Sequence, residues 1–228
     1  MADIEYINLK ECILAENEGD AQEVRDLLKE KNVILWNIMS SPGSGKTTFI
    51  VDVIKRFGSL PNEEGKNRGL SFGVIEADIE STVDAEKIHA LGIPTIQLST
   101  GGGCHLDAAM TMEALHHMPL DDLDVLIIEN VGNLVCPAEF DVGANFATML
   151  LSVPEGDDKC IKYPLMFTVT QAVFVTKMDV LPYFDFNIEA LKHNTRRLNA
   201  DLAIIPVSVK TGEGMDTAIA WIKQQLNN

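Results

Sequence analysis

The sequence predicts an α/β fold in which a mostly parallel sheet is covered by helices on both faces. Short apolar runs typical of strands alternate with segments whose apolar residues recur at helical spacing. A glycine-rich loop lies between the first strand and the helix that follows it. Strands that alternate with helices in this way form parallel sheets, whose ligands bind at the carboxyl ends of the strands.

The elements follow one another in a regular order along the chain. We expect strands at residues 33–39, 72–77, 95–98, 125–129, 146–153, 172–176 and 203–206. We expect helices at residues 48–54, 83–91, 106–117, 188–198 and 215–226. The segment 58–69 is polar and rich in glycine, proline and asparagine, which is typical of a connector. This order predicts one domain over residues 33–228.

A helical arm is expected ahead of that domain, within residues 1–32. From about Leu9 to Lys31, apolar residues recur at helical spacing among many charges, as in an amphipathic helix. The pair Gly19-Asp20 is a candidate break that would divide this arm into two helices.

The charge balance restricts the partners of the chain. Its 18 basic and 34 acidic residues give a formal net charge of −16. That charge repels nucleic acid and anionic membranes, so we expect neither as a partner. The apolar stretches are too short for a membrane helix, and the first residues lack the pattern of a secretory signal. Together with four cysteines that form no compact disulfide framework, these features predict a cytoplasmic protein.

The loop from Ser40 to Thr47, SSPGSGKT, matches the phosphate-binding loop of P-loop NTPases, although Ser40 replaces the usual first glycine. Glycines let backbone N–H groups curl around phosphate oxygens, and the following helix directs its positive end at the same anion. Lys46 is expected to reach the β- and γ-phosphates, and the Thr47 hydroxyl to hold Mg²⁺. The predicted phosphate-binding residues are Gly43, Ser44, Gly45, Lys46, Thr47 and Thr48.

Acidic residues at two strand ends complete the predicted hydrolytic site. Glu129 ends a strongly apolar strand, where an acid can hold Mg²⁺ directly or through water. Gly132 follows, where its N–H can sense a γ-phosphate and make the next loop a switch. Asp78 also follows a strand, so we assign it to Mg²⁺ or to the attacking water. Its alternative role is a helix cap, for which its neighbours Ser81, Thr82 and Asp84 compete. The predicted catalytic residues are therefore Lys46, Asp78, Glu129 and Gly132.

Two later segments predict that the base is guanine. The stretch TKMD, from Thr176 to Asp179, resembles the base-reading segment of GTPases. The Asp179 carboxylate can accept hydrogen bonds from guanine N1–H and from the 2-amino group, a donor pair that adenine lacks. The Lys177 stem would lie along the base plane. A loop after the last strand would contact guanine O6 through backbone N–H groups, and its residues are Ser208, Val209 and Lys210.

A thiol and an imidazole stand side by side on a glycine-rich turn, at Cys104 and His105. Cys136 lies inside the predicted switch loop. Thiolate and neutral imidazole bind Ni²⁺ and Zn²⁺, so these three residues form a candidate metal site; the alternative is unrelated buried thiols. A nearby helix N-terminus is expected to lower the pKa of Cys104. Cys12 and Cys160 have no ligand pattern and are interpreted as structural or incidental thiols.

The position of Cys136 in the switch loop connects the two candidate sites. GTP would draw the loop toward the γ-phosphate through Gly132, and hydrolysis would release it. That movement would bring Cys136 to Cys104 and His105 or take it away, which gives a metal site gated by GTP and GDP. The fourth ligand would be water, a carboxylate or a residue of a second subunit. Since no arginine lies in a switch segment, slow intrinsic turnover is expected.

Several stretches resemble one family over nearly the whole domain: SSPGSGKTT, VIEADIESTVDA, TGGGCHLDA, ENVGNLVCPAEFDVG, TKMD and KTGEGMD. They are similar to the HypB family of hydrogenase nickel-incorporation GTPases. The resemblance implies a G-domain of the dimerising SIMIBI type, a homodimer on GTP binding and the partner HypA. It also implies delivery of nickel to the large subunit of nickel–iron hydrogenase. The family's metal ligands fall on Cys104, His105 and Cys136. Its nucleotide residues fall on Lys46, Thr47, Asp78, Glu129, Lys177 and Asp179.

The chain departs from the family pattern in its arm. Some members carry cysteine-rich or histidine-rich N-terminal segments that bind or store nickel, whereas this arm has only Cys12 and no histidine. The related urease GTPase UreG uses a Cys-Pro-His motif, but Cys104 and His105 have no proline between them. Two alternatives stay open: a nucleotide-responsive zinc- or nickel-binding adaptor and a urease-type nickel maturation GTPase. A metabolite kinase is disfavoured, because the sequence has no arginine-rich lid segment.

Overall fold

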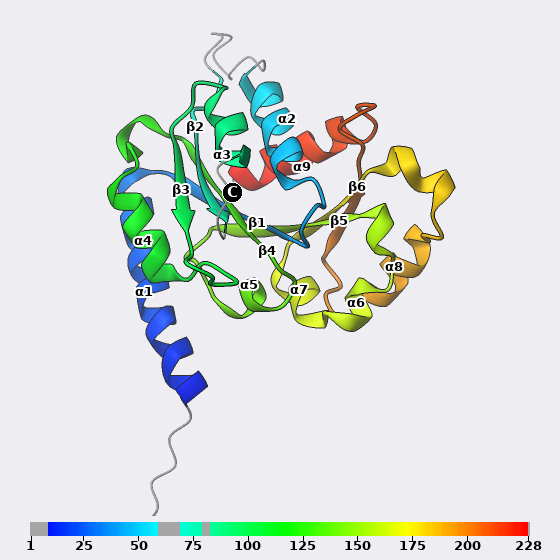
Figure 1. Ribbon diagram of the computed structural model, residues 1–228, viewed down its shortest axis with the longest axis horizontal. Coiled ribbons are helices and arrows are strands. Elements are labelled where there is room, and N and C mark those ends of the chain that lie inside the picture. Colours follow the sequence, from blue (N-terminus) through cyan, green and yellow to red (C-terminus); the bar gives the residue numbers. More distant parts are fainter. Residues whose placement is uncertain (1–8, 59–68, 79–82, 228) are drawn as a thin grey trace, which may run out of the picture.

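The computed structural model describes residues 9–58, 69–78 and 83–227. Within these residues seven parallel strands form one sheet in the order β3-β2-β4-β1-β5-β6-β7 (Figure 1). The strands are β1 (Ile34–Ser40), β2 (Phe72–Asp78), β3 (Thr95–Ser99), β4 (Val125–Gly132), β5 (Phe146–Ser152), β6 (Ala172–Thr176) and β7 (Ala203–Pro206). The predicted parallel sheet is confirmed. Residues 59–68 of the predicted connector, and the candidate caps Ser81 and Thr82, lie outside the described residues.

One face of the sheet is covered by α2 (Lys46–Gly58), α3 (Val83–His89) and α9 (Met215–Leu226). Aromatic rings form much of the core on this face. The Trp36 ring stacks on Phe146 with centroids 5.4 Å apart, and the Phe49 and Phe174 rings lie 4.7 Å apart. The Trp36 indole N–H donates to the Thr148 hydroxyl at 2.8 Å, so its polar atom is satisfied in the core. This packing fixes β1, from which the phosphate-binding loop emerges.

The other face is covered by α1 (Leu9–Lys31), α4 (Ala108–His116), α7 (Pro164–Val169) and α8 (Ile188–Thr195). The chain also forms the short helices α5 (Cys136–Glu139) and α6 (Lys159–Lys162), and 3-10 turns at Leu120–Asp122, Val153–Glu155 and Met178–Tyr183. The sequence pattern does not predict α5, α6 or α7, since their four to six residues are too few to show helical periodicity. No helix among the described residues is long and apolar enough to cross a bilayer.

α1 is one continuous helix, so the candidate break at Gly19-Asp20 is wrong. An interior glycine costs a helix only about 1 kcal/mol relative to alanine, which packing on the domain can offset. The C-terminal half of α1 buries Ala21, Val24 and Leu28, the last two in the same apolar cluster as α4. Its N-terminal half extends beyond the sheet (Figure 1). The predicted arm therefore contributes to the core of the domain that it precedes.

Two element boundaries near the strand ends also differ from expectation. The sequence predicts that β4 ends at Glu129, but β4 runs on to Gly132 because Asn130 and Val131 are buried as well. The helix expected from residue 106 begins at Ala108. Asp107 caps it, since its carboxylate accepts a hydrogen bond from a backbone N–H of the first turn.

Candidate nucleotide and metal site

The phosphate-binding loop leaves β1 at Ser40 and enters α2 at Lys46, at the carboxyl edge of the sheet (Figure 1). Gly43 and Gly45 have φ angles of +72° and +98°, which residues with side chains rarely adopt. Lys46 Nζ donates to Ser40 Oγ at 3.0 Å, and that hydroxyl donates to the Ser41 carbonyl at 2.7 Å. The serine that replaces the usual first glycine therefore holds the lysine of the loop in place.

Thr47 and Glu129 bring two side-chain oxygen atoms together at the start of α2. The Thr47 hydroxyl donates to Glu129 Oε1 at 2.8 Å, and both residues are buried. Glu76 of β2 pairs in register with Glu129 and is buried too; its place in the middle of a strand offered no signal of a functional role. Asp78 ends β2 at the same edge of the sheet, and its assignment to Mg²⁺ or to the attacking water stays a prediction.

Gly132 lies against the phosphate-binding loop. β1 and β4 pair so that Ser40 is opposite Gly132. A Cβ atom at Gly132 would lie 2.9 Å from both the nitrogen and the Cα of Pro42, which is closer than real Cβ atoms approach backbone. Glycine is therefore required for this close approach. The contact brings the start of the predicted switch loop next to the loop that would bind the phosphates.

The strand that carries the predicted base-reading segment also holds the phosphate-binding loop. Thr176 Oγ1 donates to the Ser44 carbonyl at 2.7 Å, and Lys177 Nζ donates to the Gly43 carbonyl at 2.7 Å. Lys177 has a φ of +60°, in the left-handed region that residues other than glycine seldom occupy. Its ammonium group thus contacts backbone of the phosphate-binding loop. The position of its stem along a base stays a prediction.

Asp179 joins the two segments that are predicted to bind guanine. Its Oδ1 accepts a hydrogen bond from Ser208 Oγ at 2.8 Å, and its Oδ2 lies 3.6 Å from Lys210 Nζ. The Ser208 hydrogen bond, with a smaller contribution from the Lys210 charge, holds the pKa of the Asp179 carboxyl below its usual value. Asp179 is therefore an anionic acceptor at neutral pH, as recognition of guanine would require.

The three predicted metal ligands meet at one point, although Cys136 lies 32 residues beyond Cys104 in the sequence. The Sγ atoms of Cys104 and Cys136 are 2.8 Å apart, and Cys104 Sγ is 3.6 Å from His105 Nδ1. One ligand atom from each residue lies within 4.8 Å of the other two. Both cysteines are free thiols. The cluster lies where β3 and β4 lead into their loops, beside the phosphate-binding edge.

The surroundings of the cluster set its protonation. The His105 ring stacks on Phe140 with centroids 3.9 Å apart, and burial lowers the pKa of His105 and favours the neutral, metal-binding imidazole. The expected lowering of the Cys104 pKa is wrong, because its hydrogen bond with Cys136 raises that pKa and desolvation adds to the effect. The helix that follows Cys104 begins only at Ala108, so the thiol does not lie in its first turn, where the effect of the dipole is largest. A metal would displace the thiol protons on binding.

Two asparagines that sequence reasoning missed connect these loops. Asn130 of β4 is fully buried, and its Oδ1 accepts from the backbone N–H of Leu106, the residue after His105, at 3.3 Å. Asn133 Nδ2 donates to the Cys104 carbonyl at 3.2 Å. The strand that carries Glu129 is thereby bonded to the loop that carries Cys104 and His105. A single asparagine in a strand or loop has no pattern that reveals such a long-range contact.

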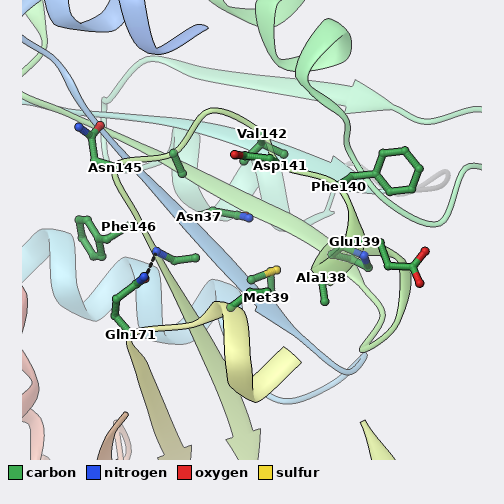
Figure 2. A pocket seen from close by; sticks show the side chains of 14 residues that line it. Asn37, Met39, Ala138, Glu139, Phe140, Asp141, Val142, Asn145, Phe146 and Gln171 are labelled. Carbon is green, nitrogen blue, oxygen red and sulfur yellow. Dashed lines mark hydrogen bonds between the residues drawn. The ribbon is translucent and has the colours of Figure 1, made fainter. Parts of the chain in front are cut away.

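A cavity of about 270 Å³ lies next to the segment that follows Cys136 (Figure 2). Residues 137–142 line one side of it. Asn37 of β1 and Gln171, the residue before β6, also line it, and Gln171 Oε1 accepts the Ala147 N–H at 2.7 Å. Atoms that face a cavity lack packing partners on that side. The position of this segment therefore depends on its other contacts.

Together, the glycine loop after β1, the acid on neighbouring β4 and the polar segments after β6 and β7 define a P-loop NTPase. The family model described as the nucleotide-binding domain of CobW/HypB/UreG matches residues 34–206. A hydrogenase maturation factor HypB from Azotobacter chroococcum is 42% identical over 219 residues, which are 96% of this chain and 69% of that protein. The chain belongs to the CobW/HypB/UreG family, within its HypB branch.

Two solved HypB structures share the fold. The structure of HypB from Helicobacter pylori in complex with nickel has a TM-score of 0.84 and 33% identity, covering 93% of this chain and 95% of that one. HypB from Archaeoglobus fulgidus has a TM-score of 0.83 and 36% identity, covering 93% and 99%. These likenesses confirm the predicted P-loop fold and the predicted family.

Proposed function

We propose that the chain is a GTP-hydrolysing nickel metallochaperone that helps to insert nickel into the large subunit of nickel–iron hydrogenase. The cluster of Cys104, His105 and Cys136 beside a nucleotide-binding edge is the observation that carries this proposal. Its relatives are called hydrogenase maturation factors, and one HypB was solved in complex with nickel. Two thiolates and an imidazole suit Ni²⁺ as cargo, and Zn²⁺ is the alternative ion because it accepts the same ligands.

The proposed hydrolytic site uses residues from three strand ends. Lys46 clamps the β- and γ-phosphates, and Asp78 orients the attacking water or contributes to the magnesium site. The Thr47 hydroxyl and the Glu129 carboxylate, 2.8 Å apart and buried, are hard oxygen ligands that fit Mg²⁺. Bound there, Mg²⁺ would neutralise charge on the phosphates. Asp179 and the loop of residues 208–210 select guanine.

The proposed gate couples the two sites through β4 and the loop after it. The Gly132 N–H contacts the γ-phosphate of GTP, and Cys136 lies four residues further along the same loop. Movement of Gly132 therefore moves one of the metal ligands. The hydrogen bond from the Leu106 N–H to Asn130 transmits the same movement to the loop of His105. GTP and GDP thus favour different metal affinities.

The proposed partners follow from the family. They are a second copy of the chain, which joins on GTP binding, together with HypA and the hydrogenase large subunit. A residue of the second copy, a carboxylate or water completes the metal coordination. The protein works in the cytoplasm, consistent with a net charge of −16 that disfavours anionic surfaces.

The hydrolytic role predicts slow, guanine-specific turnover. We expect phosphate release from GTP at below about 1 s⁻¹, because the sequence has no arginine in a switch segment, and little release from ATP, because Asp179 would select guanine. Glu129→Ala should lower the rate at least tenfold, since it removes the carboxylate beside Thr47. Phosphate-release assays measure both. If Glu129→Ala abolishes hydrolysis but metal is still delivered to hydrogenase, the adaptor alternative is correct and hydrolysis is not part of the function.

The gate predicts that nucleotide changes metal affinity. Titration of Ni²⁺ into the protein with GDP, and separately with a non-hydrolysable GTP analogue, should give dissociation constants that differ about tenfold, which corresponds to about 1.4 kcal/mol of coupling. Reciprocally, Ni²⁺ should change the affinity for the two nucleotides by the same ratio. Equal metal affinities in the two nucleotide states would rule out the gate.

A further inference from the structure

The N-terminal helix contacts both segments that carry the metal ligands. Asn17 of α1 is only 7% exposed, and its side chain makes a hydrogen bond to each segment. Its Nδ2 donates to the Asp141 carbonyl at 2.9 Å, in the segment that follows Cys136. Its Oδ1 accepts the Ala108 N–H at 2.9 Å, at the start of the helix that follows Cys104 and His105. One amide therefore bridges the two segments.

Other α1 contacts fall on the same segment after Cys136. Lys10 Nζ lies 2.9 Å from a Glu139 carboxylate oxygen, and the Arg25 guanidinium pairs with the Asp141 carboxylate. Gly143 packs so closely on α1 that a Cβ there would lie 2.6 Å from the Val24 side chain. The exposed Lys10 pair adds little stability. The buried Asn17 bonds matter more, because their loss would leave two backbone groups unsatisfied.

The segment contacts the domain as well as α1: Val142 is buried in the apolar cluster with α4, and Ala138 packs on the cluster that includes α7. Residues 137–142 border the cavity of about 270 Å³, so their atoms that face it lack packing partners there (Figure 2). Asp141 is the fifth residue after Cys136, and Phe140 between them carries the ring on which His105 stacks. A shift of this segment relative to the start of α4 would therefore change the separation of the cysteine sulfurs, and α1 contacts both.

We propose that Asn17 is a positioning residue of the metal centre, which sets the distance between the Cys136 segment and the Cys104–His105 segment. It ligates no metal; it acts through Asp141 and Ala108. The inference rests on the proposed metal site and deepens it, because it makes the N-terminal helix part of that site. Residues that orient ligands typically change metal affinity by about 10- to 100-fold when they are removed.

The test compares Asn17→Ala with Glu16→Ala, an exposed neighbour on the same helix. Competition titrations with a chromophoric chelator should show that Asn17→Ala binds Ni²⁺ about tenfold more weakly, while Glu16→Ala matches the unmodified protein. The thiolate-to-nickel charge-transfer bands of Asn17→Ala should weaken or shift at saturating Ni²⁺. A purely structural role would lower the melting temperature and leave those bands unchanged. Unchanged affinity and bands in folded Asn17→Ala would overturn the inference.

Two further measurements keep the result interpretable. Binding of a fluorescent GDP analogue shows whether each variant is folded, because the predicted phosphate-binding loop and guanine segments follow β1, β6 and β7 and not the strands that lead to the metal ligands. If Asn17→Ala is poorly folded, Asn17→Leu keeps side-chain volume in the helix and should show the same loss of nickel affinity. The proposed function fails separately if the unmodified protein binds Ni²⁺ no more tightly than its Cys136→Ser variant. That result would also remove the basis of the inference.

Discussion

Replacing Asp179 by asparagine is expected to lower the affinity for GTP about a hundredfold and to raise that for xanthosine triphosphate by a similar factor. In the proposed complex the carboxylate accepts hydrogen bonds from guanine N1–H and from the 2-amino group. The asparagine NH₂ would oppose that amino group but match the 2-carbonyl of xanthine. Titrations with fluorescent analogues of the guanine and xanthine nucleotides measure both changes.

The local geometry makes this substitution informative. The Ser208 hydroxyl donates to Asp179 Oδ1 at 2.8 Å, and an asparagine carbonyl can accept the same bond, so the loop is expected to keep its position. Asp185→Asn is the matched control, because Asp185 is exposed and lies outside both guanine segments. It should leave the affinity for each nucleotide unchanged. GTP binding unaltered by Asp179→Asn would exclude this residue from the base pocket.

Replacing Cys136 by serine is expected to weaken Ni²⁺ binding at least a hundredfold. Removal of a direct ligand should cost more than the 10- to 100-fold that loss of a supporting residue typically costs. A serine hydroxyl stays protonated at neutral pH and is a poor partner for a borderline-soft ion. Competition titration measures the affinity, and loss of the thiolate-to-nickel absorption identifies the missing sulfur.

The control for Cys136→Ser is Cys12→Ser. Cys12 is an exposed free thiol on α1, so this variant removes one sulfur without touching the cluster. It should bind Ni²⁺ like the unmodified protein. The affinity of Cys136→Ser for GDP should stay within about twofold, since the residue touches no predicted nucleotide ligand. Nickel binding that is the same in both cysteine variants would locate the metal elsewhere.

Much of the fold is predictable because its signals are local. Apolar runs such as residues 172–176 and 203–206 mark the strands to the residue, and the GSGKT stretch marks the turn between β1 and α2. Boundaries fail where a tertiary contact overrides the pattern. α1 continues through Gly19 because its second half packs on the domain, and β4 continues past Glu129 because the residues beyond it are buried.

Some residues of the candidate site are likewise recognisable from the sequence, and others only from the fold. Cys104 and His105 adjoin in sequence, so a ligand pair is visible there without a structure. The role of Asn17 is not visible in the sequence, because its partner Ala108 lies 91 residues away and a lone asparagine on a helix has no distinguishing pattern. The Cys104 pKa was predicted in the wrong direction for a related reason. A local rule about helix ends was outweighed by Cys136, a neighbour that only folding provides.

The 2.8 Å separation of the Cys104 and Cys136 sulfurs has a consequence for oxidation. A disulfide bond is about 2.05 Å long, so a small movement brings the two thiols to bonding distance. Loss of two electrons and two protons to an oxidant would then convert both sulfurs to a form that no longer donates as thiolate. Preparations kept under air without a reductant should progressively lose their capacity for nickel, whereas ions already bound would protect the pair.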